Sequence, residues 1–203
     1  MCRRYIATLK RIKDKGQKIK VNFPFVFYLL TFIFMVILGI DPGTTAIGYA
    51  ILNCAGPTAK ILAADTVKIT SRDGVSRLRE LHSGIKKVVS RWKPEAVAVE
   101  RLFFAKNQKT ALAVAEARGV ILLTTALAGL KFYEYTPLEI KRAVTGDGRA
   151  DKEQIKKMVH LIFPQKDIAG ARDDVFDAIA IATCCHQDIR IKEAYKKQTP
   201  HLF

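Results

Sequence analysis

Three short apolar runs at the start of the patterned part of this chain constrain its fold more than any other feature. Residues 36–41, 46–53 and 60–69 are apolar or alternating, and Pro42-Gly43 and Gly56-Pro57 separate them. Runs of this length with Pro and Gly between them are typical of antiparallel strands joined by tight turns. We therefore expect a three-stranded antiparallel meander.

Helix and strand patterns alternate after the meander. Apolar residues recur every three or four positions over 72–92, which predicts an amphipathic helix. The continuous apolar run 95–100 is typical of a buried central strand, and a helix over 108–130 and a strand over 131–136 follow. This order favours parallel pairing through right-handed crossovers. We expect an α/β protein with a mixed five-stranded sheet, flanked by these helices and by others at 138–144, 151–162 and 174–187.

Composition favours one globular domain with a polyanionic partner. Of 203 residues, 49% are hydrophobic and 26% charged, which suits a packed core and excludes a disordered or collagen-like chain. Lys and Arg outnumber Asp and Glu by 34 to 19, for a net charge of +15, so nucleic acid and anionic membrane both qualify as partners. Four cysteines without a Cys-x-x-Cys motif indicate a reducing, cytoplasmic location.

The N-terminal segment raises the question of a membrane anchor. Residues 1–20 carry eight Lys or Arg, and an apolar run over 23–40 follows. Because 36–40 fit better as a core strand, only 23–35 remain, which is too short to cross a bilayer. We expect an appendage at 1–34, a folded domain at 35–190 and a basic tail at 191–203, without stable membrane association; the sequence leaves open whether 1–34 are translated or form an anchor.

Acidic residues stand at the ends of two apolar strands and on one face of a predicted helix. Asp41 and Glu100 each end an apolar strand, and Asp174 and Asp177 lie three apart on one face of a helix. A carboxylate at such a position is costly unless it is paired or bound to a cation. Hard divalent cations prefer oxygen ligands, and two of them about 3.5–4 Å apart recur in phosphodiester hydrolysis. We call these four residues the acidic cluster and expect them to meet.

Other interpretations of these acids are open at this point. Asp41 precedes Pro42-Gly43 and also suits a turn. Asp173 or Asp174 also suits a helix N-cap. Glu100 is harder to explain in this way, because Glu is depleted in strands and almost never fully buried without a partner.

Four motifs, taken together, resemble the RuvC family of Holliday junction resolvases. They are Ile40-Asp-Pro-Gly-Thr-Thr-Ala-Ile-Gly-Tyr49, Val99-Glu-Arg-Leu-Phe-Phe-Ala-Lys-Asn107, Ala115-Glu-Ala-Arg-Gly119 and Asp174-Val-Phe-Asp-Ala-Ile-Ala-Ile-Ala182. The resemblance covers about residues 36–187. It implies an RNase H-like fold, a homodimer and Mg²⁺-dependent cutting of four-way DNA junctions in recombination and repair.

The resemblance also implies roles for single residues. The acidic cluster matches the family's catalytic and metal-binding carboxylates; some members have His at the position of Asp174, and Asp173 is the adjacent alternative. Phe103 matches an aromatic residue that stacks on a base at the junction centre, although a core role would also explain it. Basic residues expected to contact DNA phosphates are Lys106 and Lys109 beside Phe103, and Lys141 and Lys152 near the scissile phosphate.

The mechanism implied by the resemblance uses two Mg²⁺ ions per subunit, with Mn²⁺ as a substitute. One ion activates water for attack on phosphorus and the other stabilises the leaving 3′ oxygen, which gives a 5′-phosphate and a 3′-hydroxyl. A homodimer with two-fold symmetry suits paired nicks on symmetry-related strands. The small and apolar residues of 108–130 suit either the dimer interface or the core. A branch-migration helicase is the expected partner complex.

Two other functions compete with junction resolution. A nuclease acting on pre-ribosomal RNA uses the same fold, and cleavage of structured RNA would distinguish it. The segment Asp41-Pro-Gly-Thr-Thr-Ala-Ile-Gly also looks like the first phosphate-binding hairpin of actin-like and sugar-kinase ATPases. Those ATPases need two such domains, and this chain shows no second glycine-rich phosphate loop.

Overall fold

The computed structural model describes residues 35–43, 46–101, 108–164, 168 and 170–198, without the side chains of 108–110 and 195–198. The expected appendage at 1–34 lies outside the described residues, so its role stays a prediction.

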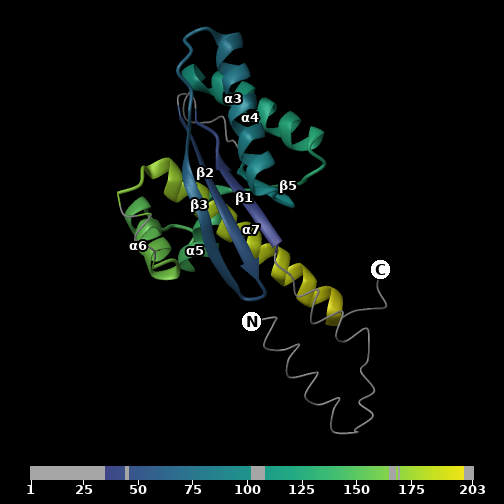
Figure 1. Ribbon diagram of the computed structural model, residues 1–203. Helices are drawn as coiled ribbons and strands as arrows, with labels where there is room; N and C mark the ends of the chain where they lie inside the picture. The colour runs from purple at the N-terminus through teal and green to yellow at the C-terminus, as the bar shows by residue number, and fades with distance from the viewer. Residues whose placement is uncertain (1–34, 44–45, 102–107, 165–167, 169, 199–203) are drawn as a thin grey trace, which may run out of the picture. The chain divides into compact units, whose positions relative to one another are not determined.

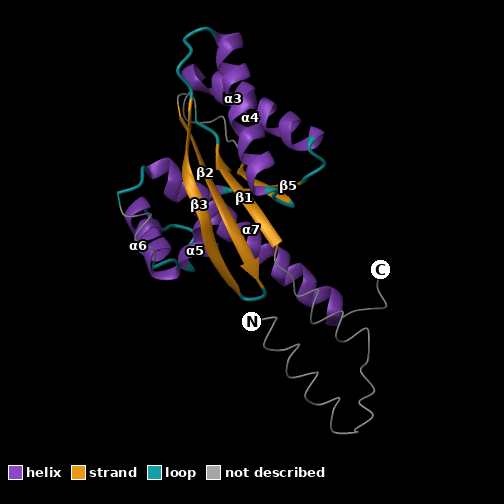
Figure 2. Cartoon of the chain, viewed as in Figure 1, coloured by secondary structure: helices purple, strands orange, loops and turns teal. Residues whose placement is uncertain are grey.

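A mixed sheet of five strands organises the described chain (Figure 2). In spatial order the strands are β3 (Thr58–Lys68), β2 (Ala46–Ala55), β1 (Met35–Asp41), β4 (Ala96–Glu100) and β5 (Lys131–Tyr135). The first three strands pair antiparallel, and β1, β4 and β5 pair parallel. The predicted meander followed by parallel strands is therefore confirmed.

Two layers of helices cover the sheet (Figure 1). Leu38 and Ile40 of β1 pack with α3 (Gly74–Trp92) and α4 (Gln108–Leu127) on one face. The other face packs against α7, which spans Asp173–Gln198. The same core includes residues of α5 (Pro137–Thr145) and α6 (Lys152–Ile162). None of the described helices is both long enough and apolar enough to cross a membrane.

Helix α7 extends further than its apolar pattern predicts. We expect a helix over 174–187 from the sequence, but the helix continues to Gln198, into the segment expected as a basic tail. Tyr135 of β5 donates a hydrogen bond from its hydroxyl to Asp188 Oδ2 at 2.9 Å. Lys192 Nζ lies 2.7 Å from the same oxygen, one helical turn further on. These polar contacts stabilise the part of the helix beyond the apolar stripe.

Two glycines allow α7 to lie directly on the sheet. A Cβ atom at Gly39 of β1 would stand 2.2 Å from the Ala178 carbonyl oxygen, and one at Gly48 of β2 would stand 1.9 Å from that of Asp174. Any larger residue at either strand position would displace the helix backbone. The two glycines thus fix how close the first turns of α7 come to β1 and β2.

Candidate active site

The central parallel strands bring two of the predicted acids to one end of the sheet. Ile40 of β1 pairs with Val99 of β4, so Asp41 and Glu100 are the next residues on adjacent strands. Side chains alternate between the faces of a strand. Gly39 and Ala98 contact α7 or its core, so the residues two positions further on, Asp41 and Glu100, share the α7 face.

The first two turns of α7 supply the other two acids. Asp41 pairs with Gly48 across the β1–β2 ladder, and the backbone of Asp174 lies against Gly48. This contact places the start of α7 beside Asp41. Asp177 follows one turn later on the same side of the helix. The four acids of the predicted cluster are thus contributed by β1, β4 and α7, at the same end of the sheet.

The pKa values reflect this convergence. Burial is the largest cause that raises the pKa of Asp41, and together with the negative charges of Asp177, Glu100 and Asp174, in that order, it raises this pKa to about 7. Burial is also the main cause of the raised pKa values of Glu100 and Asp177. Like charges gathered in a partly desolvated place disfavour ionisation unless a cation balances them.

Basic side chains from neighbouring elements balance part of this charge. Lys152 at the start of α6 lies 3.7 Å from Asp177 Oδ2. Arg172, just before α7, lies 3.2 Å from Asp174 Oδ2. Lys141 of α5 and Lys152 both lower the pKa of Glu100 against the effect of burial. Within the described part of the chain, no three acidic, histidine or cysteine side chains already stand together as a metal site.

Asp173 and Asp174, adjacent in sequence, have different surroundings. Asp173 forms an ion pair with Lys156 of α6 at 2.9 Å, and this hydrogen bond lowers the pKa of Asp173. The backbone of Asp174 packs against Gly48, and the negative charge of Asp174 raises the pKa of Asp41. Asp173 joins α6 to α7, and its charge, like that of Asp174, adds to the effect of burial in raising the pKa of Asp177.

The predicted DNA contacts are described only in part. Phe103 and Lys106 lie outside the described residues, and Lys109 is in the first turn of α4 with an undescribed side chain. Lys141 and Lys152 lie near the acidic cluster, as their effects on Glu100 indicate. The sequence pattern alone did not point to Arg172 or to the role of Gly48; a glycine inside a strand pattern is the signal for the latter.

A mixed five-stranded sheet with acidic residues gathered at the ends of its central strands and at the start of a helix packed across them defines an RNase H-like nuclease. More narrowly, this chain belongs to the RuvC family. The family model of the crossover junction endodeoxyribonuclease RuvC matches residues 37–186. Of the three functions considered from the sequence, this match supports the junction nuclease rather than the pre-ribosomal-RNA nuclease or the ATPase fragment.

Relatives and solved structures agree with this assignment. The chain is 47% identical to the crossover junction endodeoxyribonuclease RuvC of Moorella thermoacetica over 151 residues, which is 74% of this chain and 90% of that protein. With the RuvC of Halothermothrix orenii it shares 41% identity over 162 residues, 79% of this chain and 98% of that one.

Among solved structures, Thermus thermophilus RuvC in complex with a Holliday junction substrate matches with a TM-score of 0.72 and 35% identity, over 78% of this chain and 96% of that one. The yeast mitochondrial Holliday junction resolvase Ydc2 has a TM-score of 0.60 at 15% identity, over 81% of this chain and 84% of that one, and shows the shared fold alone.

Proposed function

We propose that this chain cuts four-way DNA junctions by hydrolysis of phosphodiester bonds at the acidic cluster, and that divalent cations bind there. The observation that carries the proposal is that the charges of three other carboxylates act on the partly buried Asp41. The solved structure of the Thermus relative with a Holliday junction supports the choice of substrate.

The donor set suits Mg²⁺. Nucleases of this family depend on divalent metals, and the acidic cluster offers only carboxylate oxygens, the ligands that Mg²⁺ and Mn²⁺ prefer. We propose that these four residues hold two Mg²⁺ ions. Bound there, the ions would supply an activated water and a Lewis acid for the leaving oxygen. Metal binding would require Asp174 and Asp177 to turn from their basic partners.

The protein's own residues would prepare the site for the DNA backbone. Lys152 reaches Asp177, and Lys141 acts on Glu100. Both ammonium groups therefore lie where the scissile phosphate would meet the cluster, and they would reduce repulsion between phosphate and carboxylates. Phe103 would stack on an unpaired base at the junction centre, and Lys106 and Lys109 would contact nearby phosphates.

A homodimer would supply the second active site. Four positions at helical spacing on α4 form an exposed, largely apolar stripe. Leu112 is 71%, Leu123 58% and Leu127 74% exposed, and a Cβ atom at Gly119 would meet nothing within 4 Å. An apolar helix face of this kind suits burial against a second copy.

A branch-migration helicase as partner and a cytoplasmic location stay predictions.

Cleavage of a synthetic mobile four-way junction tests the proposed function. We expect paired nicks on opposed strands with Mg²⁺, and none with Ca²⁺ or with the Asp41→Asn variant. Linear duplex and a structured RNA of matched length are the controls. Equal cutting of the duplex or preference for the RNA would contradict the proposal, as would cleavage by Asp41→Asn at the rate of the unaltered protein.

A further inference from the structure

Lys68, at the end of β3, lies on the same face of the sheet as the acidic cluster. Lys68 pairs with Ala46, two positions beyond the pair formed by Thr66 and Gly48. Residues directly opposite in an antiparallel ladder share a face, and that face alternates with a period of two. Because Gly48 faces the backbone of Asp174, Lys68 also faces the side on which α7 begins. The Lys68 side chain is exposed.

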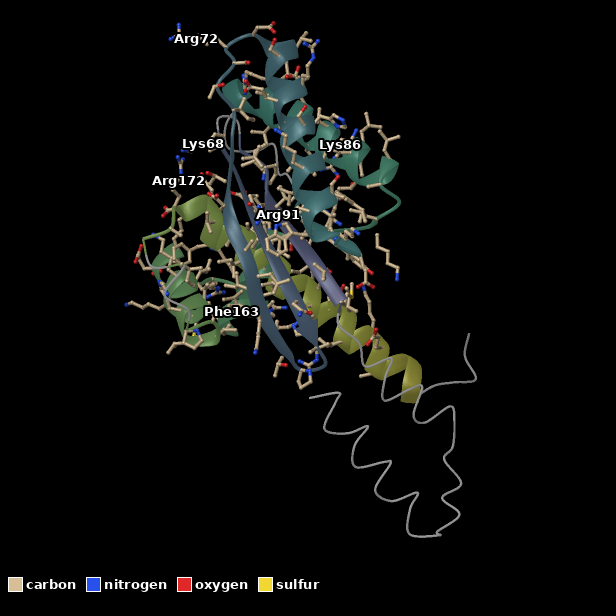
Figure 3. The ribbon with its side chains drawn as sticks, viewed as in Figure 1. Lys68, Arg72, Lys86, Arg91, Phe163 and Arg172 are labelled. Carbon is tan, nitrogen blue, oxygen red and sulfur yellow. The ribbon has the colours of Figure 1, made fainter. Side chains whose placement is uncertain are left out.

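Arg172 lies near the same end of the sheet. It is the second residue before Asp174, and its side chain is 63% exposed although one guanidinium nitrogen lies 3.2 Å from Asp174 Oδ2. A guanidinium group has five donors in a fixed fork, so this single contact leaves most of them available. Figure 3 labels Lys68 and Arg172 at the end of the sheet where β3 finishes.

The strand order separates these two cations from the lysines already discussed. From β3 to β4, the features at this end are Lys68, then Asp174 over β2, then Asp41, then Glu100. Lys141 and Lys152 act on Glu100. Positive charge thus stands on both sides of the acidic cluster, and a DNA strand crossing the cluster would meet it before and after the scissile bond.

We propose that Lys68 and Arg172 form a second phosphate-binding site, which holds the DNA strand on the Asp174 side of the scissile phosphate. Arg172 would exchange its contact with Asp174 for a phosphate, since a guanidinium fork matches both groups. This exchange would also free Asp174 for a metal ion. The inference rests on the proposed function, because it takes the acidic cluster as the place where the strand is cut.

Salt dependence of DNA binding tests the site without cleavage. Junction affinity is measured in Ca²⁺ at several salt concentrations for Lys68→Glu, for Arg172→Ala and for the unaltered protein. Log affinity falls as log salt concentration rises. Removal of one phosphate-binding side chain should make this fall less steep, by about 0.7 to 0.9 in the slope. Lys60→Glu is the matched control: Lys60 is also exposed on β3, but it pairs with Asn53 at the opposite end of the strand.

The site is supported if Lys68→Glu and Arg172→Ala reduce both affinity and slope while Lys60→Glu does not reduce the slope. Unchanged slopes for both variants would overturn it, and so would an equal decrease in Lys60→Glu, which would indicate general charge attraction.

Metal binding gives a second readout: calorimetry with Mn²⁺ and no DNA should show tighter binding in Arg172→Ala, because a competing cation is gone. Failure of the proposed function is separate, since it would appear as cleavage by Asp41→Asn.

Discussion

Burial and three neighbouring carboxylates raise the pKa of Asp41 from its ordinary 3.8 to about 7. Between these two values the folded protein keeps a proton on Asp41 that the unfolded chain has released. The stability that this group contributes is therefore fully present below pH 4, and it is lost as the pH rises to about 7. Neutral Asn in place of Asp41 removes this dependence.

Without metal at pH 8, Asp41→Asn should be more stable than the unaltered protein, by an amount on the order of a few kcal/mol. The difference should shrink as the pH falls toward 4. Urea unfolding of both proteins in a chelator at pH 8, 6 and 4.5 measures it. A difference that does not change with pH would show that Asp41 carries no unusual charge cost in the folded state.

The same substitution should abolish cleavage while junction binding persists. Loss of one charged ligand from the acidic cluster should reduce the rate by roughly 10³-fold or more. Binding should be equal or tighter, because one negative charge near the DNA backbone is removed. Single-turnover cleavage in Mg²⁺ and affinity in Ca²⁺ measure the two effects, and parallel decreases in both would mean that Asp41 acts on binding or folding instead.

At the scale of elements, the contact between α7 and β2 determines where the acidic cluster forms. Gly48→Ala would place a Cβ atom 1.9 Å from the carbonyl oxygen of Asp174, and backbone cannot yield as a side chain does. We expect a decrease of about 1–3 kcal/mol in the free energy of unfolding, together with a large decrease in cleavage. Urea unfolding and single-turnover cleavage check this.

Gly74→Ala is the control for that experiment. Gly74 is the first residue of α3, and a Cβ atom there would meet nothing within 4 Å. The free energy of unfolding of the Gly74→Ala variant should differ from that of the unaltered protein by no more than about 1 kcal/mol. Equal effects of the two substitutions would contradict the close approach of α7 to the sheet.

The order and type of the elements could be predicted because local patterns determine them. The meander, the helix ending at Trp92 and the strand ending at Glu100 follow from apolar periodicity and from Gly and Pro positions. The extension of α7 beyond residue 187 could not be predicted, since Asp188 and Tyr135 are 53 positions apart in sequence and meet only in the folded chain. The ion pair between Asp173 and Lys156 of α6 is also tertiary, so sequence alone could not distinguish the two adjacent aspartates.

At the scale of the whole molecule, the exposed stripe on α4 should control assembly. Leu123→Glu would put a charge into the proposed dimer interface, which should weaken association by roughly 100-fold or more. Sedimentation equilibrium should then show a monomer, and the nicks on opposed strands should lose their coupling.

Leu161→Glu is the matched control for assembly, because Leu161 is 73% exposed on α6, in the other helical layer. It should leave the dimer intact. If Leu123→Glu still sediments as a dimer, or if both variants dissociate alike, the α4 stripe is not the interface.

The claim on which the function depends most is that divalent cations bind among Asp41, Glu100, Asp174 and Asp177. A crystal of the protein grown with Mn²⁺ tests it directly by anomalous scattering. We predict anomalous peaks about 2.0–2.2 Å from carboxylate oxygens of this cluster, and no such peaks in crystals of Asp41→Asn. Mn²⁺ bound elsewhere on the protein, with these four side chains free of metal, would contradict the claim.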